Sequence, residues 1–227
     1  NLDSIGPIAA SVRCHAELDA ILSGDGGPVP EAATLRGLRL AIPTTLALDA
    51  MDKHVADSFA AAVNRLKEAG ALVEEIAIPE FAELAGINAN GGFTAAEAWA
   101  WHRDLIARAG KRYDPRVVSR IMRGKDMSAA DYLDLLDARE AWVAAVDRRI
   151  AGYDALIMPT TPIVAPAVAD LQASDEAYYA ANGLILRNPT LINFLDGCAL
   201  SLPCHASGTA PVGLMIAGSN GTDRRIL

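Results

Sequence analysis

The stretch from Asn193 to Gly218 reads NFLDGCALSLPCHASGTAPVGLMIAG, and it decides the fold. It holds two apolar runs, Ala199–Pro203 and Val212–Ala217, with polar residues, a glycine and a proline between them. Glycine and proline interrupt sheet hydrogen bonding, and neither run has a polar face. The stretch therefore predicts two short buried strands joined by a turn-rich loop.

A strand–helix–strand pattern lies upstream. Leu38–Ile42 is an apolar run that predicts a buried strand, and Asp52 is placed to cap a following helix. Apolar residues then recur at helical spacing until Gly70, which is expected to end that helix. Leu72–Ile78 predicts the next strand. Two strands joined through a helix pair in parallel by default, so the sequence predicts an α/β fold.

Helices are expected over most of the remaining chain. Ser11 is a plausible N-cap, Thr94–Glu97 has the spacing of a capping box, and Ser128–Asp131 is expected to open a longer helix. Between the first helix and the first strand, Gly24–Pro30 is predicted to be a linker. The predicted helices cover Arg13–Leu22, about Thr94–Arg108, Pro115–Met122, a long helix from Ser128 to about Ile150, and about Ser174–Leu186, before Arg187–Thr190 leads to the closing stretch.

A proline-rich segment follows another predicted strand. Asp154–Met158 is apolar after its first residue, and Pro159–Pro162 reads PTTP. Proline cannot donate to a sheet ladder, so the chain should leave the sheet at Pro159. Three interpretations stay open for this segment: a rigid surface crossing, a peptide ligand, or the rim of a pocket at the carboxyl end of the strand.

Three blocks resemble, in order, the amidase signature family of serine hydrolases. They are the opening LDSIGPIAASV of Leu2–Val12, the pattern Asp-x-x-Ile-x-Pro-Thr-x-Pro of Asp154–Pro162, and the closing stretch. Asp196 and Cys198 stand where the family has glycine and proline, so the local turn can differ. The resemblance implies a mixed, mostly parallel sheet covered by helices on both faces.

The resemblance also implies that residues 1–227 are the C-terminal part of a single amidase domain, truncated at both ends. Family mechanism uses a nucleophilic serine, a bridging serine and a neutral lysine, all of which should lie upstream of Asn1. No Gly-x-Ser-x-Gly occurs here, and the lysines lie in polar surroundings. The complete protein should hydrolyse a small amide or urea-like C–N bond to carboxylate and ammonia or amine, through a serine acyl-enzyme and without a cofactor. This chain alone should be inactive.

Candidate substrate-binding residues are Arg120, Thr160 and Asn193. The segment Arg120–Gly124 resembles one in glutamine-dependent amidotransferase A subunits that supplies an arginine for the substrate carboxylate, and a planar bidentate donor suits that task. A solvated surface arginine is the competing interpretation. Thr160 and Asn193 are pocket-rim candidates by family position, against backbone hydrogen bonding in a turn. Leu186–Asn188 offers no acidic residue, which argues against glutamine as substrate.

The other reactive side chains are weaker candidates for catalysis or metal binding. Ser201, Cys204 and His205 suggest a nucleophile with a base, but neighbouring residues of a strand point to opposite faces. The remaining histidines lack a partner at helical spacing, so no metal site is expected; they are His15, His54 and His102.

The amino-acid composition excludes some classes of binding partner. A net charge of −8 without a basic stripe disfavours nucleic-acid binding, and no apolar run is long enough to cross a membrane. An odd number of cysteines, 3, favours free thiols and a cytoplasmic setting. The expected partner is a small amide substrate. The alternatives are a non-catalytic α/β binding or scaffolding domain, the A component of a glutamine-dependent amidotransferase, and a homo-oligomer contacting through Trp99 or Trp101.

Overall fold

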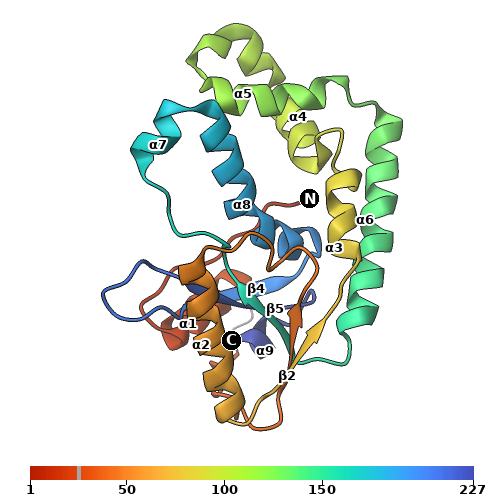
Figure 1. The fold of residues 1–227 in the computed structure, drawn as a ribbon. Helices are drawn as coiled ribbons and strands as arrows, with labels where there is room; N and C mark the ends of the chain where they lie inside the picture. Colours follow the sequence, from red (N-terminus) through yellow and green to blue (C-terminus); the bar gives the residue numbers. More distant parts are fainter. Residues whose placement is uncertain (25–26) are drawn as a thin grey trace.

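The computed structural model describes residues 1–24 and 27–227. One five-stranded sheet runs through it in the order β2–β1–β3–β5–β4 (Figure 1). Strand β1 pairs in parallel with β2 and β3, whereas β5 pairs antiparallel with β3 and β4. The strands are β1 (Arg39–Pro43), β2 (Leu72–Ile76), β3 (Ala155–Pro159), β4 (Cys198–Pro203) and β5 (Gly213–Gly218). The predicted mixed α/β sheet is confirmed.

Helices lie against both faces of the sheet, and a helical lobe containing α4 and α5 projects above it in Figure 1. The helices are α1 (Val12–Ser23), α2 (Lys53–Glu68), α3 (Glu80–Ile87), α4 (Gly92–Ala109), α5 (Pro115–Met122), α6 (Ala129–Ile150), α7 (Val168–Ala173), α8 (Asp175–Phe194) and α9 (Asp223–Ile226), with short 3₁₀ turns η1 (Gly110–Arg112) and η2 (Arg123–Asp126).

The strand–helix–strand unit forms as predicted, and β1 and β2 are parallel. Gly70 follows α2 with φ 97°, the left-handed region that glycine adopts most easily. Asp52 stands at the N-cap position of α2 as predicted, but its side chain does not cap the helix. The Asp52 carboxylate makes no helix-capping hydrogen bond and instead accepts one, 2.9 Å long, from the backbone N–H of Val164. Asp52 therefore joins the start of α2 to the segment that follows β3.

Each face of the sheet buries its own apolar cluster, because side chains alternate along every strand. On one face, β1, β3, β4 and β5 pack against α2 and α9. On the other face, β1, β3 and β5 pack against α3, α4, α6 and α8. The fully buried aromatic side chains belong to the second cluster and are Phe81, Phe93 and Phe194.

A capping box forms at Ser128, where the sequence predicted only the start of a helix, and not at Thr94. Ser128 accepts from the N–H of Asp131, whose carboxylate accepts from the N–H of Ser128, at the start of α6. The box at Thr94–Glu97 is wrong, because α4 already begins at Gly92. The Glu97 carboxylate accepts instead from the Tyr132 hydroxyl at 2.8 Å, so a tertiary contact takes the side chain that local spacing assigned to a cap.

Helix α8 is longer than predicted. The expected end near Leu186 is wrong, since the helix continues through Pro189 to Phe194. Proline costs a helix hydrogen bond. Burial of Leu191 and Phe194 in the core offsets that loss, because each buried apolar side chain contributes roughly 1.5–3 kcal/mol.

The two closing strands form as predicted and pair antiparallel, but only β5 is largely buried. Strand β4 lies at the sheet edge and alternates, with Leu200 buried and Ala199 and Ser201 exposed. The prediction that both runs are buried is therefore wrong for β4. The first helix is confirmed, with Ser11 as its N-cap. The predicted linker Gly24–Pro30 lies partly outside the described residues.

Candidate functional site

The carboxyl end of β3 meets the two closing strands. Thr160 follows β3, and its backbone N–H donates to the carbonyl of Gly213 at 2.8 Å. Its hydroxyl lies 2.5 Å from that of Ser201 on β4. A Cβ on Gly213 would come within 2.5 and 2.6 Å of these two oxygens, so glycine is required for the contact. Thr160 and Ser201 thus form a two-hydroxyl pair at the rim where the chain leaves the sheet.

Asn188 fixes the backbone beneath this rim. It is fully buried, and its side-chain amide donates to the carbonyls of Pro159 at 2.7 Å and Ala47 at 3.0 Å. Two hydrogen bonds satisfy a polar group that would otherwise be costly to bury. Leu46 and Ala50, in the same loop after β1, have positive φ values of 65° and 49°. Strained backbone held by surrounding contacts is typical of functional sites.

Arg187 adds a positive charge at this place. Its guanidinium donates to the Ala47 carbonyl at 3.1 Å and to Asn188 at 3.1 Å. Burial lowers the pKa of Arg187, and the negative charge of Asp49 acts in the opposite direction. The group stays protonated at neutral pH, because an arginine pKa starts far above it. The sequence prediction missed both Arg187 and Asn188, because it placed them in a loop; the signal was a polar pair beside a proline.

Asn193 lies one turn further along α8. Its side-chain amide donates to the carbonyl of Leu2 at 2.8 Å and so ties the opening segment to the helix. The same residue lines a cavity of about 320 Å³ between the opening segment, α1, α8, β4 and the C-terminal residues. Other residues in its wall include Ser4, His15, Ile192, Cys198 and Asp223.

Arg120 belongs to α5, and this helix lies in the lobe above the sheet (Figure 1). It donates to the side-chain oxygen of Asn182 at 2.6 Å, and its guanidinium carbon is 5.5 Å from the Tyr179 ring centroid. The wall of the cavity that Asn193 lines contains neither Thr160 nor Arg120. The structure therefore puts the three candidates in three places rather than in one pocket.

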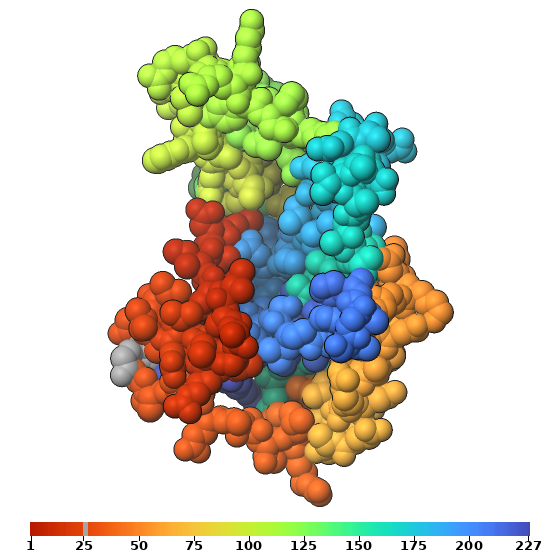
Figure 2. All heavy atoms as spheres, turned by 90° about the vertical axis from the view of Figure 1, so that its left-hand side faces the viewer, coloured from red at the N-terminus to blue at the C-terminus, as the bar shows by residue number. Residues whose placement is uncertain are grey.

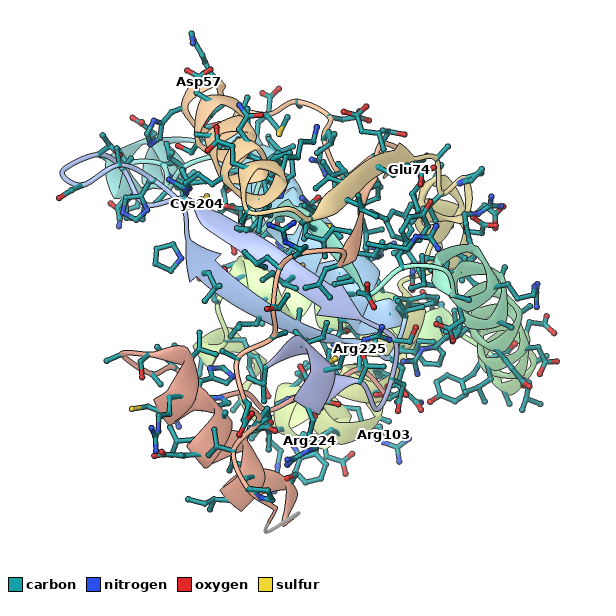
Figure 3. All side chains as sticks on the ribbon, turned by 90° about the horizontal axis from the view of Figure 1, so that it is seen from below. Asp57, Glu74, Arg103, Cys204, Arg224 and Arg225 are labelled. Carbon is teal, nitrogen blue, oxygen red and sulfur yellow. The ribbon has the colours of Figure 1, made fainter. Side chains whose placement is uncertain are left out.

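Cys204 and His205 are not arranged as a catalytic nucleophile and base. Cys204 is buried in the cluster beneath α2, and burial raises the pKa of its thiol (Figure 3). A raised pKa disfavours the reactive thiolate. His205 accepts a hydrogen bond from the N–H of Val212 at 3.1 Å, which holds the ring against the loop.

The lysines also lack the setting of a general base. All four are exposed, and Lys53 pairs with Asp57 at 2.6 Å across one turn of α2. A lysine that serves as a neutral base is usually buried in apolar surroundings, and none of these four is buried. Within residues 1–24 and 27–227, no group of His, Cys, Asp or Glu could hold a metal ion. None of the helices in these ranges combines the length and the hydropathy that a bilayer crossing requires.

Comparison with curated proteins gives consistent relatives. A 2-amino-5-chloromuconic acid deaminase of Comamonas testosteroni is 30% identical over 100% of this chain and 50% of its own length. The A component of a glutamyl-tRNA(Gln) amidotransferase of Symbiobacterium thermophilum is 28% identical over 100% of this chain and 53% of its own. The chain spans about half the length of the curated relatives it matches.

Solved structures share the fold. A crystal structure of an amidase superposes with a TM-score of 0.79 at 24% identity, covering 97% of this chain and 50% of that one. An allophanate hydrolase of Kluyveromyces lactis gives 0.73 at 23% identity over 88% of this chain and 32% of its own. The Amidase family profile matches residues 1–227, which is the whole sequence. The chain belongs to the Amidase family.

Proposed function

We propose that residues 1–227 are the C-terminal part of an amidase domain, and that the complete domain hydrolyses a small amide or urea-like C–N bond. The observation that carries the proposal is the family match over the whole chain, beside relatives about twice as long. A serine outside this chain would attack the carbonyl carbon, and the C–N bond would break to release ammonia or an amine. Water would then hydrolyse the acyl-enzyme to a carboxylate.

The part of this chain in that reaction would be to form one wall of the substrate pocket. The hydroxyl pair of Thr160 and Ser201 stands at the carboxyl end of β3, where open α/β sheets bind ligands. Asn188 holds the backbone beneath it, and Arg187 keeps a positive charge close by. Asn193 would act through its bond to Leu2, which positions the opening segment.

Arg120 would anchor a substrate carboxylate through the donors that its present partner leaves free. Its bond to Asn182 occupies one guanidinium nitrogen, and the planar group has further donors for a bidentate contact. Arg120→Lys would then raise the KM for carboxylate-bearing amides about tenfold and leave neutral amides unchanged. Arg103→Lys, an exposed change in the same lobe, is the control.

A second candidate is the A component of a glutamine-dependent amidotransferase, because several relatives carry that name. The resemblance implies an acidic residue for glutamine shortly before Asn193, and Leu186, Arg187 and Asn188 offer none there. A cation and an apolar side chain do not recognise the α-ammonium group of glutamine, so we place this function second.

The test is ammonia release from a panel of simple amides, urea-like compounds, glutamine and 2-amino-5-chloromuconic acid. It compares residues 1–227 with a form extended upstream of Asn1 by the preceding coding sequence. We expect turnover only in the extended form, and the substrate preferred there separates the two candidates. Turnover by residues 1–227 alone, or no turnover of any compound by the extended form, contradicts the proposal.

Thr160→Val in the extended form tests whether Thr160 lines the substrate pocket. Loss of one neutral hydrogen bond to substrate is worth about 1 kcal/mol, so KM should rise about fivefold with kcat unchanged. Thr190→Val removes an exposed hydroxyl from α8 and serves as the control. Equal KM values for both variants would remove Thr160 from the pocket.

A further inference from the structure

The opening segment and α1, residues Asn1–Gly24, form an N-terminal arm that exposes large apolar side chains. Ile5 is 88% exposed, Ile8 fully exposed and Ile21 74% exposed, and Leu18 and Leu22 are also exposed. The arm occupies one face of the molecule beside the surface of the C-terminal strands (Figure 2). Single exposed apolar residues are ordinary, but a contiguous group marks a contact surface.

Helix α1 has an apolar face that is suited to packing against another surface. Cys14, Leu18 and Ile21 recur at helical spacing and form an apolar stripe, yet all three are exposed. Ala16, on another side of the helix, is the buried residue of α1. A helix of 12 residues is marginal in water without tertiary packing, even when it is capped as this one is. The stripe therefore needs a partner surface.

The sheet edge beside the arm is open in the same way. Ala199 and Ser201 of β4 are exposed, although their cross-strand neighbours Ala217 and Met215 of β5 are buried. Helix α8 covers β5 on that face, and the cavity of about 320 Å³ lies between β4 and the arm. In the described part of the chain, no strand pairs with the outer edge of β4. An open edge strand is a template for further pairing or packing.

We infer that the arm stripe and the outer side of β4 together form the surface on which the rest of the amidase domain packs. The occupant is the part of the domain that the relatives carry and that this chain does not span, about half of their length. That much chain must contact this half over an apolar interface to make one domain. This inference rests on the proposed function, in that both assume a complete amidase domain.

Mixed charge on the arm supports a protein partner. Helix α1 carries one positive side chain, Arg13, and two negative ones, Glu17 and Asp19, and polar residues of both signs suit the rim of an apolar contact. A membrane surface would instead favour lysine and arginine on the polar face. Packing there would place the remaining half against the cavity and next to Ser201, and so complete a pocket between the two halves.

The experiment compares the same substitutions in residues 1–227 and in the form extended upstream of Asn1. Ile8→Lys with Ile21→Lys places two charges on the arm. Trp101→Lys with Leu105→Lys changes two exposed apolar residues on α4 and is the matched control. In residues 1–227 both pairs should move the Tm by less than about 2 °C, since the side chains are exposed. In the extended form only the arm pair should lower it, by more than about 5 °C.

Hydrogen exchange keeps the test decisive if the extended arm variant does not fold. In the wild-type proteins, amides of α1 should exchange at least about tenfold more slowly in the extended form than in residues 1–227. Equal exchange, or equal Tm shifts for the two pairs in the extended form, would overturn the inference. A concentration-dependent dimer of residues 1–227, abolished by the arm pair and without contrast in the extended form, would assign the surface to a second copy and also overturn it.

Ammonia release separates the two proposals. An extended form that shows the arm contrast but turns over no amide contradicts the proposed function and leaves the packing surface standing. An extended form that is active but shows no contrast at the arm contradicts only the packing surface.

Discussion

Helices α1 and α2 share a sequence pattern and differ in their surroundings. Both follow a polar residue, both carry apolar side chains at helical spacing, and both lie near the sheet. Helix α2 buries Val55, Phe59 and Val63 in the cluster it shares with the strands. Helix α1 buries Ala16 and leaves its apolar stripe in solvent.

The difference shows that apolar residues at helical spacing indicate which face of a helix is suited to packing. The spacing does not show whether that face is covered in a given chain. Hydrophobic stabilisation follows the area removed from water, so the same side chain contributes in α2 and contributes almost nothing in α1. Substitutions in the N-terminal arm and in the covered part of the sheet should therefore differ in cost even when they are chemically alike.

The largest contrast should come from a buried aromatic residue. Phe59→Ala in α2 removes a side chain that is 6% exposed, and large-to-small core changes of this kind cost about 3–5 kcal/mol. Ile21→Ala in α1 should change the free energy of unfolding by less than about 0.5 kcal/mol. Urea unfolding of residues 1–227 measures both. A loss above about 2 kcal/mol for Ile21→Ala would show that the stripe is already buried in this chain.

A buried polar residue should give the next largest effect. Asn188→Ala removes the amide that bonds the carbonyls of Ala47 and Pro159. Arg187 still donates to Ala47, but Pro159 loses its bond to this amide, and an unsatisfied buried group costs about 1–3 kcal/mol. We expect a loss of about 3 kcal/mol in urea unfolding. Thr190→Ala, an exposed change on the same helix, should be neutral. A neutral Asn188→Ala would mean that the loop after β1 is not held from α8.

A charge pair in the covered part of the molecule should make a contribution to stability that depends on pH. Glu80 accepts from Arg149 through both oxygens, at 2.7 and 2.8 Å, and these hydrogen bonds hold the pKa of Glu80 below its usual value, although burial acts to raise it. A carboxyl with a lowered folded pKa contributes stability above its unfolded pKa, and this contribution is lost as pH falls through the folded value. Glu80→Gln should cost about 1 kcal/mol at pH 7 and progressively less below about pH 4.

The matched pair on the arm is Arg13 and Glu17, 3.3 Å apart and both exposed. Glu17→Gln should change the free energy of unfolding at pH 7 by no more than about 0.5 kcal/mol, because exposed pairs of this kind contribute little. A pH-independent loss for Glu80→Gln would show that packing, and not the charge, makes its contribution.

Local signals predicted much of the fold. The limits of α5 match the predicted Pro115–Met122, and Ser11 and Ser128 cap the helices they were expected to cap. Helix ends depend on residues within a few positions, so such features are readable from short windows. The strand order of the closing pair follows for the same reason, since a short loop joins them.

Long-range contacts explain what the sequence did not reveal. Glu97 bonds Tyr132 instead of capping its own helix, and α8 continues through Pro189 because the residues beyond it are buried. At the candidate site, Asn188 joins Ala47 and Pro159, which are 141 and 29 positions away. No window of the sequence contains all three, so the support beneath Thr160 could not be predicted.

The smallest contrast compares two serine caps that the sequence makes equivalent. Ser128 caps α6, which is packed in the core, so Ser128→Ala should lower the free energy of unfolding by about 1 kcal/mol. Ser11 accepts from the N–H of Cys14 at 3.2 Å, and Ser11→Ala weakens α1 by a similar amount. Because α1 is barely packed, that loss should appear as local opening: exchange of α1 amides should rise about fivefold while the urea midpoint stays unchanged. Equal shifts in the urea midpoint for both variants would show that α1 unfolds together with the core, and the distinction between the arm and the covered sheet would then fail.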